Sequence, residues 1–155
     1  MKPRMNFYRA APDAIKALVA VESQVTASGL EQSLIELVKT RASQINGCAY
    51  CINMHTEDAR KHGETEQRLY LLNAWRESPL YSERERAALA WTEALTTLPN
   101  GVCDEVYAEA AAEFSEKELT YLTSAIASIN VWNRFGAAYR WTPPPRRQRV
   151  AAATS

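Results

Sequence analysis

Helix-start signals recur along the whole chain, and they constrain its fold more than any other feature. The capping-box pattern Ser-x-x-Glu occurs three times, at Ser28 and Glu31, at Ser82 and Glu85, and at Ser115 and Glu118. In this pattern the two side chains satisfy backbone N–H groups that a helix start leaves unpaired. The apolar residues between these signals follow helical spacing, and no period-two run long enough for a sheet is present. We therefore predict an all-α fold.

The predicted helices cover most of the chain. They begin at Asp13 and continue over about 28–44, 47–62, 65–76, 82–98, 104–114 and 115–141, with Asp104 as the cap of the helix 104–114. We expect residues 1–12 to form an extended lead-in that docks through Phe7 and Tyr8, and residues 142–155 to form a mobile tail. A chain of 155 residues suits one domain. We place this domain at residues 13–141 and expect about six to seven helices in it.

The charge balance and the cysteine content exclude several classes of partner. Eighteen Lys and Arg residues stand against eighteen Asp and Glu residues, and no basic patch interleaves with aromatic residues, so we expect no nucleic-acid partner. No stretch approaches the roughly 18 apolar residues of a membrane span, and the N-terminus leads into no signal-peptide core. We therefore expect a cytoplasmic protein without a membrane partner. In a reducing compartment, three cysteines indicate redox or metal chemistry rather than a disulfide framework.

One predicted helix concentrates the reactive side chains. Cys48, Cys51 and His55 stand at positions i, i+3 and i+7, so on a helix they form one stripe. Asn46 is the predicted N-cap of this helix, and Gly63 is the residue that follows its end. Both thiols then lie in the first turn, where unpaired N–H groups and the helix dipole favour a thiolate. The imidazole lies one turn after the second thiol, within reach as a proton acceptor or donor.

Several chemistries could use this stripe. A zinc site needs four ligands, and the stripe supplies three of them. The fourth would come from His62, Cys103, Glu36 or Glu57. Haem attachment requires a histidine directly after the second cysteine, where Ile52 stands. The thiols could also be packing residues beside a satisfied histidine, and we interpret Cys103 as a small buried hydrophobe of this kind. The spacing favours a dithiol/disulfide couple with the histidine as its acid-base partner.

A longer pattern links this stripe to a known family. Glu36 precedes Cys48 by twelve residues, and the stripe is embedded in the run RASQINGCAYCINMH, from Arg41 to His55. Together with the later run NVWNR at 130–134, this pattern resembles the AhpD-like alkylhydroperoxidase branch of the carboxymuconolactone decarboxylase family. The resemblance covers about residues 13–141. It changes the interpretation of Glu36, which by its own pattern would be an ordinary solvated glutamate.

The resemblance implies an all-helical subunit that forms a homo-oligomer, a trimer or a hexamer, and a peroxidase without cofactor or metal that serves antioxidant defence. Cys51 would be the peroxidatic thiol and Cys48 the resolving thiol, with Glu36 and His55 as a proton relay. The substrate would be a hydroperoxide, and an external dithiol of the lipoyl type would restore the pair. Tyr50 stands where the well-characterised peroxidase of this group has a relay histidine, and a tyrosine cannot act as a base near pH 7.

Two other functions fit the same residues. The first is a lyase acting on a muconolactone-type acid, the activity for which the family is named, although those members are not distinguished by a Cys-x-x-Cys pair. The second is a thiol redox sensor that does not turn over. Consumption of cumene hydroperoxide with a dithiol reductant would separate a peroxidase from a sensor.

Overall fold

Helices follow one another throughout residues 2–143, the part of the chain that this computed structural model describes. The eight α-helices of this part are α1 (Phe7–Ala10), α2 (Pro12–Thr26), α3 (Gln32–Ile45), α4 (Ala49–Lys61), α5 (Glu66–Leu71), α6 (Glu83–Thr96), α7 (Asp104–Glu113) and α8 (Glu116–Tyr139). Two 3-10 helices, η1 (Leu72–Glu77) and η2 (Leu98–Asn100), lie between them. Residues 2–143 form one domain without a strand, which confirms the all-α prediction, and none of its helices is long and apolar enough to cross a membrane.

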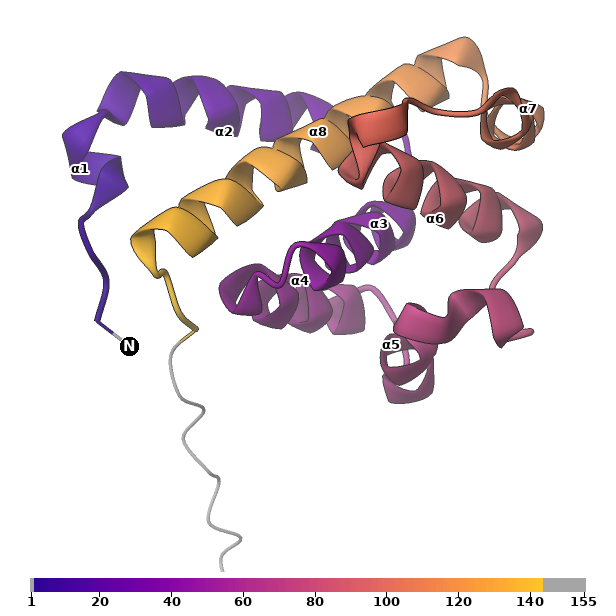
Figure 1. Ribbon diagram of the computed structural model, residues 1–155, viewed down its shortest axis with the longest axis horizontal. Helices are drawn as coiled ribbons and strands as arrows, with labels where there is room; N and C mark the ends of the chain where they lie inside the picture. The colour runs from indigo at the N-terminus through magenta and orange to yellow at the C-terminus, as the bar shows by residue number, and fades with distance from the viewer. Residues whose placement is uncertain (1, 144–155) are drawn as a thin grey trace, which may run out of the picture.

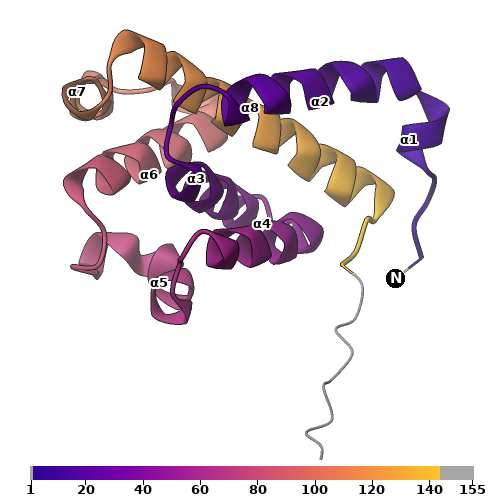
Figure 2. The same ribbon diagram turned by 180° about the vertical axis from the view of Figure 1, so that it is seen from behind.

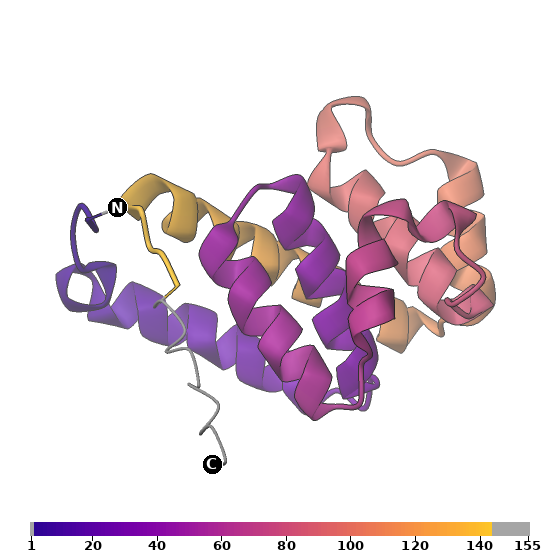
Figure 3. The same ribbon diagram turned by 90° about the horizontal axis from the view of Figure 1, so that it is seen from below.

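The long helix α8 runs across the molecule, and α2, α3 and α6 pack along it (Figure 1). Helix α3 also packs against α4 and α6, so it is enclosed by other helices. Its buried residues therefore include a glutamate, a lysine, a threonine and a serine besides apolar side chains. Seen from behind (Figure 2) and from below (Figure 3), α1 and the C-terminal end of α8 lie at one end of the molecule. Helices α5, α6 and α7 lie at the other end.

Two of the three predicted capping boxes form. Ser82 and Ser115 cap α6 and α8, and each bonds reciprocally with the glutamate three residues later. The prediction for Ser28 was wrong, because Gly29 takes a left-handed backbone with φ 95° and the hydroxyl of Ser28 accepts from the N–H two residues later at 3.2 Å. Helix α3 consequently begins at Gln32.

The N-terminal segment is partly helical rather than extended, so the structure holds one helix more than the predicted six to seven. The side chain of Asn6 caps α1, and α2 begins at Pro12, whose fixed φ suits a first helical position. The predicted docking of Phe7 is confirmed, because this ring is 5% exposed and lies 5.0 Å from the ring of Phe135 on α8. Tyr8 is more exposed and stacks on Phe7 at 4.5 Å. Helix α1 thereby covers the C-terminal end of α8.

The ends of α7 and α8 differ from their predicted positions. The N-cap residue of α7 is Cys103 rather than Asp104, and Cys103 is exposed, so its interpretation as a buried hydrophobe was wrong. Helix α8 ends at Tyr139 rather than near Trp141, because Arg140 adopts a left-handed conformation with φ 55°. The predicted tail lies outside the described residues from position 144 onward.

Candidate active site

A cysteine, rather than the predicted Asn46, caps the helix that carries the thiols. Asn46 is the C-cap of α3, and Gly47 then takes φ 66°, a left-handed conformation that glycine adopts without strain. Cys48 becomes the N-cap of α4, and its Sγ accepts from the N–H of Cys51 at 3.4 Å. Both sulfur atoms thus lie at the helix start, where unpaired N–H groups stabilise negative charge on sulfur.

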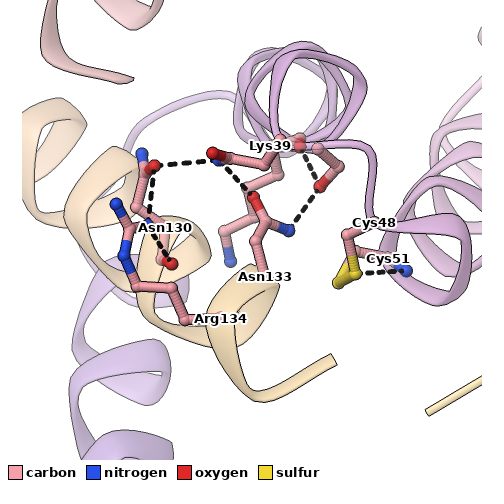
Figure 4. Close-up of a disulfide and its surroundings, with 8 residues drawn as sticks. Lys39, Cys48, Cys51, Asn130, Asn133 and Arg134 are labelled. Carbon is pink, nitrogen blue, oxygen red and sulfur yellow. Dashed lines mark hydrogen bonds between the residues drawn. A yellow bond between two sulfur atoms is a disulfide. The ribbon is translucent and has the colours of Figure 1, made fainter. Parts of the chain in front are cut away.

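Cys48 and Cys51 form a disulfide, with their Cα atoms 5.4 Å apart. Figure 4 shows this disulfide at the start of α4. Both cysteines are only 3% exposed, and they pack in a small apolar cluster with Ala42 of α3 and Ile129 of α8. The fold therefore brings the two sulfur atoms within bonding distance in a dry environment, so they can alternate between dithiol and disulfide.

The carboxylate of Glu36 lies beside the imidazole of His55, with Oε2 at 2.7 Å from Nδ1. Both residues are 6% exposed, so the solvated glutamate that the pattern alone indicated is not observed. The cause is the packing of α3 against α4, which turns Glu36 toward the helix that carries the thiols. The other carboxylate oxygen accepts from Nε2 of Gln32 at 2.7 Å. Glu36 is thus held at both oxygens.

This contact fixes the tautomer of His55. An ionised carboxylate only accepts hydrogen bonds, so Nδ1 of the neutral ring carries the proton and donates it to Glu36. Nε2 is then the acceptor, and it has no hydrogen-bond partner among residues 2–143. Because His55 also lines a pocket, Nε2 is placed to exchange a proton with a thiol or with a bound molecule.

A network of asparagines ties the end of α3 to α8 beside the disulfide (Figure 4). Nδ2 of Asn46 donates to Oδ1 of both Asn130 and Asn133, each at 2.9 Å. Asn133 donates to Oγ of Ser43 at 3.0 Å, and Arg134 donates to the backbone oxygen of Asn130 at 2.6 Å. The network holds the turn that precedes the disulfide. Sequence reasoning missed this role of the asparagines because their partners lie far away in the chain.

Gly136 is the point where α8 comes closest to the disulfide. A Cβ added at this glycine would lie 2.7 Å from Sγ of Cys48 and 3.7 Å from Sγ of Cys51. The first distance is well inside normal contact, so an atom would have to move. A lone glycine inside a helical pattern is the sequence signal for such a close approach, and our sequence interpretation did not use it.

We expect Gly136→Ala to lower the free energy of unfolding of the oxidised protein by about 1 kcal/mol. Overpacking usually costs about 1–3 kcal/mol, and the better helix propensity of alanine offsets about 1 kcal/mol of it. In a Cys48→Ala background the same change should be neutral or stabilising, because the obstructing sulfur is absent. Denaturant unfolding of the four proteins measures this coupling. An equal loss in both backgrounds would show that the sulfur is not the obstacle.

A further carboxylate, Glu22 of α2, lies on the wall of the same pocket as His55. It pairs with Lys39 and accepts hydrogen bonds from Oγ of Ser128 and, at 3.0 Å, from Nε1 of Trp132. Burial alone would raise the pKa of Glu22, but Lys39 and these hydrogen bonds outweigh burial and lower the pKa below its usual value. Glu22 is therefore ionised near pH 7. Its partners come from distant parts of the chain, which is why sequence reasoning missed it.

The donor atoms near the disulfide are already engaged with one another. The two cysteines are bonded together, and His55 is bonded to Glu36. Within residues 2–143, no group of three or more His, Cys, Asp or Glu side chains is arranged to hold a metal ion. The zinc alternative therefore gains no fourth ligand from this geometry.

Fold and site together define an all-helical dithiol protein, in which a buried disulfide lies one turn from a histidine that a carboxylate orients. Residues 12–94 match the carboxymuconolactone decarboxylase family. The chain belongs to this family, and its structural relatives place it in the AhpD-like branch, which confirms the resemblance drawn from the sequence.

Three relatives are similar over most of the chain. The uncharacterised protein YdfG of Bacillus subtilis is 43% identical over 139 residues, which cover 89% of this chain and 95% of that protein. A crystal structure of an Agrobacterium tumefaciens protein of unknown function, described as a candidate antioxidant defence protein AhpD, is 43% identical with a TM-score of 0.90. That match covers 94% of this chain and all of the other. The debrominase Bmp8 is 26% identical with a TM-score of 0.76, covering 84% of this chain and 71% of Bmp8.

Proposed function

We propose that this protein is a thiol-dependent peroxidase that reduces hydroperoxides through a dithiol/disulfide couple of Cys48 and Cys51. The observation that carries the proposal is the disulfide one turn before His55, whose ring is oriented by the buried carboxylate of Glu36. Membership of the AhpD-like branch supports the same function. The biological role is then antioxidant defence.

The reaction starts from the reduced pair. Nε2 of His55 accepts the proton of Cys51, and the thiolate attacks the terminal oxygen of the hydroperoxide. The S–O bond forms while the O–O bond breaks, and the alkoxide takes the proton from His55 and leaves as an alcohol. The sulfenic acid on Cys51 reacts with the thiol of Cys48, so that the S–S bond forms, the S–O bond breaks and water leaves. Two exchange steps with an external dithiol restore both thiols and leave the donor as a disulfide.

The remaining parts of the proposal follow from the family resemblance. The external reductant is a lipoyl-type dithiol, and neither a cofactor nor a metal takes part. Tyr50 lines the pocket beside His55, where it can donate a hydrogen bond, so we assign the proton relay to Glu36 and His55 alone. The subunit assembles into a homo-oligomer, a trimer or a hexamer, and it acts in the cytoplasm.

A steady-state assay tests the proposal directly. The parent protein should consume cumene hydroperoxide continuously with a dihydrolipoyl compound as the reductant, and it should oxidise one dithiol for each hydroperoxide lost. The control is the protein in which both Cys48 and Cys51 are replaced by serine. Peroxide loss no faster than in this control would contradict the proposal and leave the redox sensor as the better function.

One relative names a second substrate for the same assay. Bmp8 is a debrominase, and it has been crystallised with 2,3,4-tribromopyrrole. Its sequence identity to this chain is low, so we treat debromination as the competing function. Bromide release from this pyrrole, with no consumption of hydroperoxide under the same conditions, would make debromination the better assignment.

A further inference from the structure

A pocket of about 210 Å³ opens beside His55 and Gly136. Gly136 also contacts the disulfide, because a Cβ at this position would meet Sγ of Cys48. The pocket therefore adjoins the sulfur atoms. Its other walls come from α1, α2, α4, α8 and the residues after α8, and they consist of Phe7, Tyr8, Val19, Glu22, Tyr50, Met54, Trp132 and Trp141.

The size of the pocket limits the group that it can hold. A dry cavity of about 150 Å³ is enough for benzene, so a pocket of about 210 Å³ has room for one six-membered ring with a small substituent. Two linked rings would not fit. The walls carry the rings of five aromatic residues, and aromatic rings attract one another in offset-stacked and edge-to-face arrangements. Size and walls both favour a single aromatic ring.

The charges around the pocket disfavour a carboxylate. Glu22 presents a carboxylate at the wall, whereas its partner Lys39 is 5% exposed and is not part of the wall. The donors of Ser128 and Trp132 are already used by Glu22. The ring of His55 is the nearest remaining polar group of the wall, and Glu36 already holds it. A ligand carboxylate would lose water and meet a like charge in return.

We propose that this pocket binds the organic group of an uncharged substrate that carries one aromatic ring, and that Glu22 discriminates against substrates with a carboxylate. The inference names the substrate class of the proposed peroxidase and rests on that function for the reaction of the bound molecule. Binding itself needs no redox step. An unreactive ligand can therefore test the pocket separately from the enzyme activity.

The ligands for this test are alcohols, added to the oxidised full-length protein and followed by isothermal titration calorimetry. They are 2-phenyl-2-propanol, which is the alcohol formed from cumene hydroperoxide, tert-butanol, which lacks the ring, and 4-(2-hydroxypropan-2-yl)benzoate, which adds a carboxylate. We expect 2-phenyl-2-propanol to bind about tenfold or more tightly than either of the others, since burial of a ring is favourable and burial of an unpaired charge is not.

Two variants assign this selectivity to particular residues. Glu22→Gln should tighten the binding of the benzoate about tenfold and change that of the neutral alcohol less than about threefold, because the charge of Lys39 is then left for the ligand. Val19→Trp should fill part of the pocket and weaken binding of 2-phenyl-2-propanol about tenfold. Val21→Trp is its matched control, because Val21 is also exposed on α2 but is not part of the wall.

The outcomes separate the two proposals. Benzoate bound by the parent as tightly as the neutral alcohol, or equal effects of Val19→Trp and Val21→Trp, would overturn the pocket assignment even if the protein consumes peroxide. The expected order of binding, with no peroxide consumption, would support the pocket and contradict the peroxidase. If Glu22→Gln fails to fold because Lys39 loses its partner, the Val19 and Val21 pair still decides where the ring binds.

Discussion

Cys51→Ser should abolish steady-state peroxide consumption, whereas Cys48→Ser should consume one hydroperoxide per chain and then stop. His55 follows Cys51 by one turn on α4, so Cys51 has the proton acceptor beside it in the proposed reaction. Without Cys48 the sulfenic acid on Cys51 has no resolving thiol, and a dimedone-type probe can trap it. Mass spectrometry of the labelled peptide identifies the sulfur that reacted.

Cys103→Ser is the matched control for these substitutions, because Cys103 is a free, exposed cysteine outside the disulfide. It should keep the parent rate. Trapping of the probe on Cys48 in the Cys51→Ser protein would reverse the two roles. That result has a physical basis, since Cys48 is the N-cap and its sulfur already accepts from the N–H of Cys51.

Glu36→Gln should slow peroxide turnover by about 10²-fold or more, the usual loss when acid-base assistance is removed. Glutamine keeps the shape of the side chain, but it removes the charge that orients the ring of His55 and stabilises its protonated form. The rate at which iodoacetamide alkylates reduced Cys51 at pH 7 should fall as well, because less thiolate is present. Stopped-flow turnover and alkylation rates measure the two effects.

Glu93→Gln provides the control for loss of a carboxylate elsewhere in the fold. Glu93 of α6 is partly buried and accepts from Arg41 and Trp75, but it is not part of the pocket beside the disulfide. It should leave turnover within about twofold of the parent. Equal turnover of Glu36→Gln and the parent across pH 6 to 9 would mean that His55 acts without Glu36 and that the relay must be reassigned.

The helices were predictable to the extent that they depend on neighbours in the sequence. The capping boxes at Ser82 and Ser115 form because each involves side chains and N–H groups within one turn. The same rule failed at Ser28, where a left-handed Gly29 intervenes, and at Asn46, where Gly47 does the same. In both cases a glycine in the left-handed region moved the helix start further along the chain.

The site divides in the same way. The spacing of Cys48, Cys51 and His55 already predicted their stripe, and the structure places them together at one face of α4 with all three buried. Glu36 looked solvated by its own pattern, and only the resemblance to a family indicated its contact with His55. That contact joins residues 19 positions apart on two packed helices, and no local rule describes it.

By itself, the sequence determined an all-α chain with two thiols and an imidazole on one helix, because capping and periodicity act over a few residues. The tertiary structure alone decided which other groups surround them. It brought Gly136 against the disulfide and closed the pocket with Trp132 and Glu22, which are 110 positions apart. Such contacts depend on how whole helices pack, since a packed helix buries whatever side chains its face carries, including carboxylates that hydrogen bonds and ion pairs then satisfy.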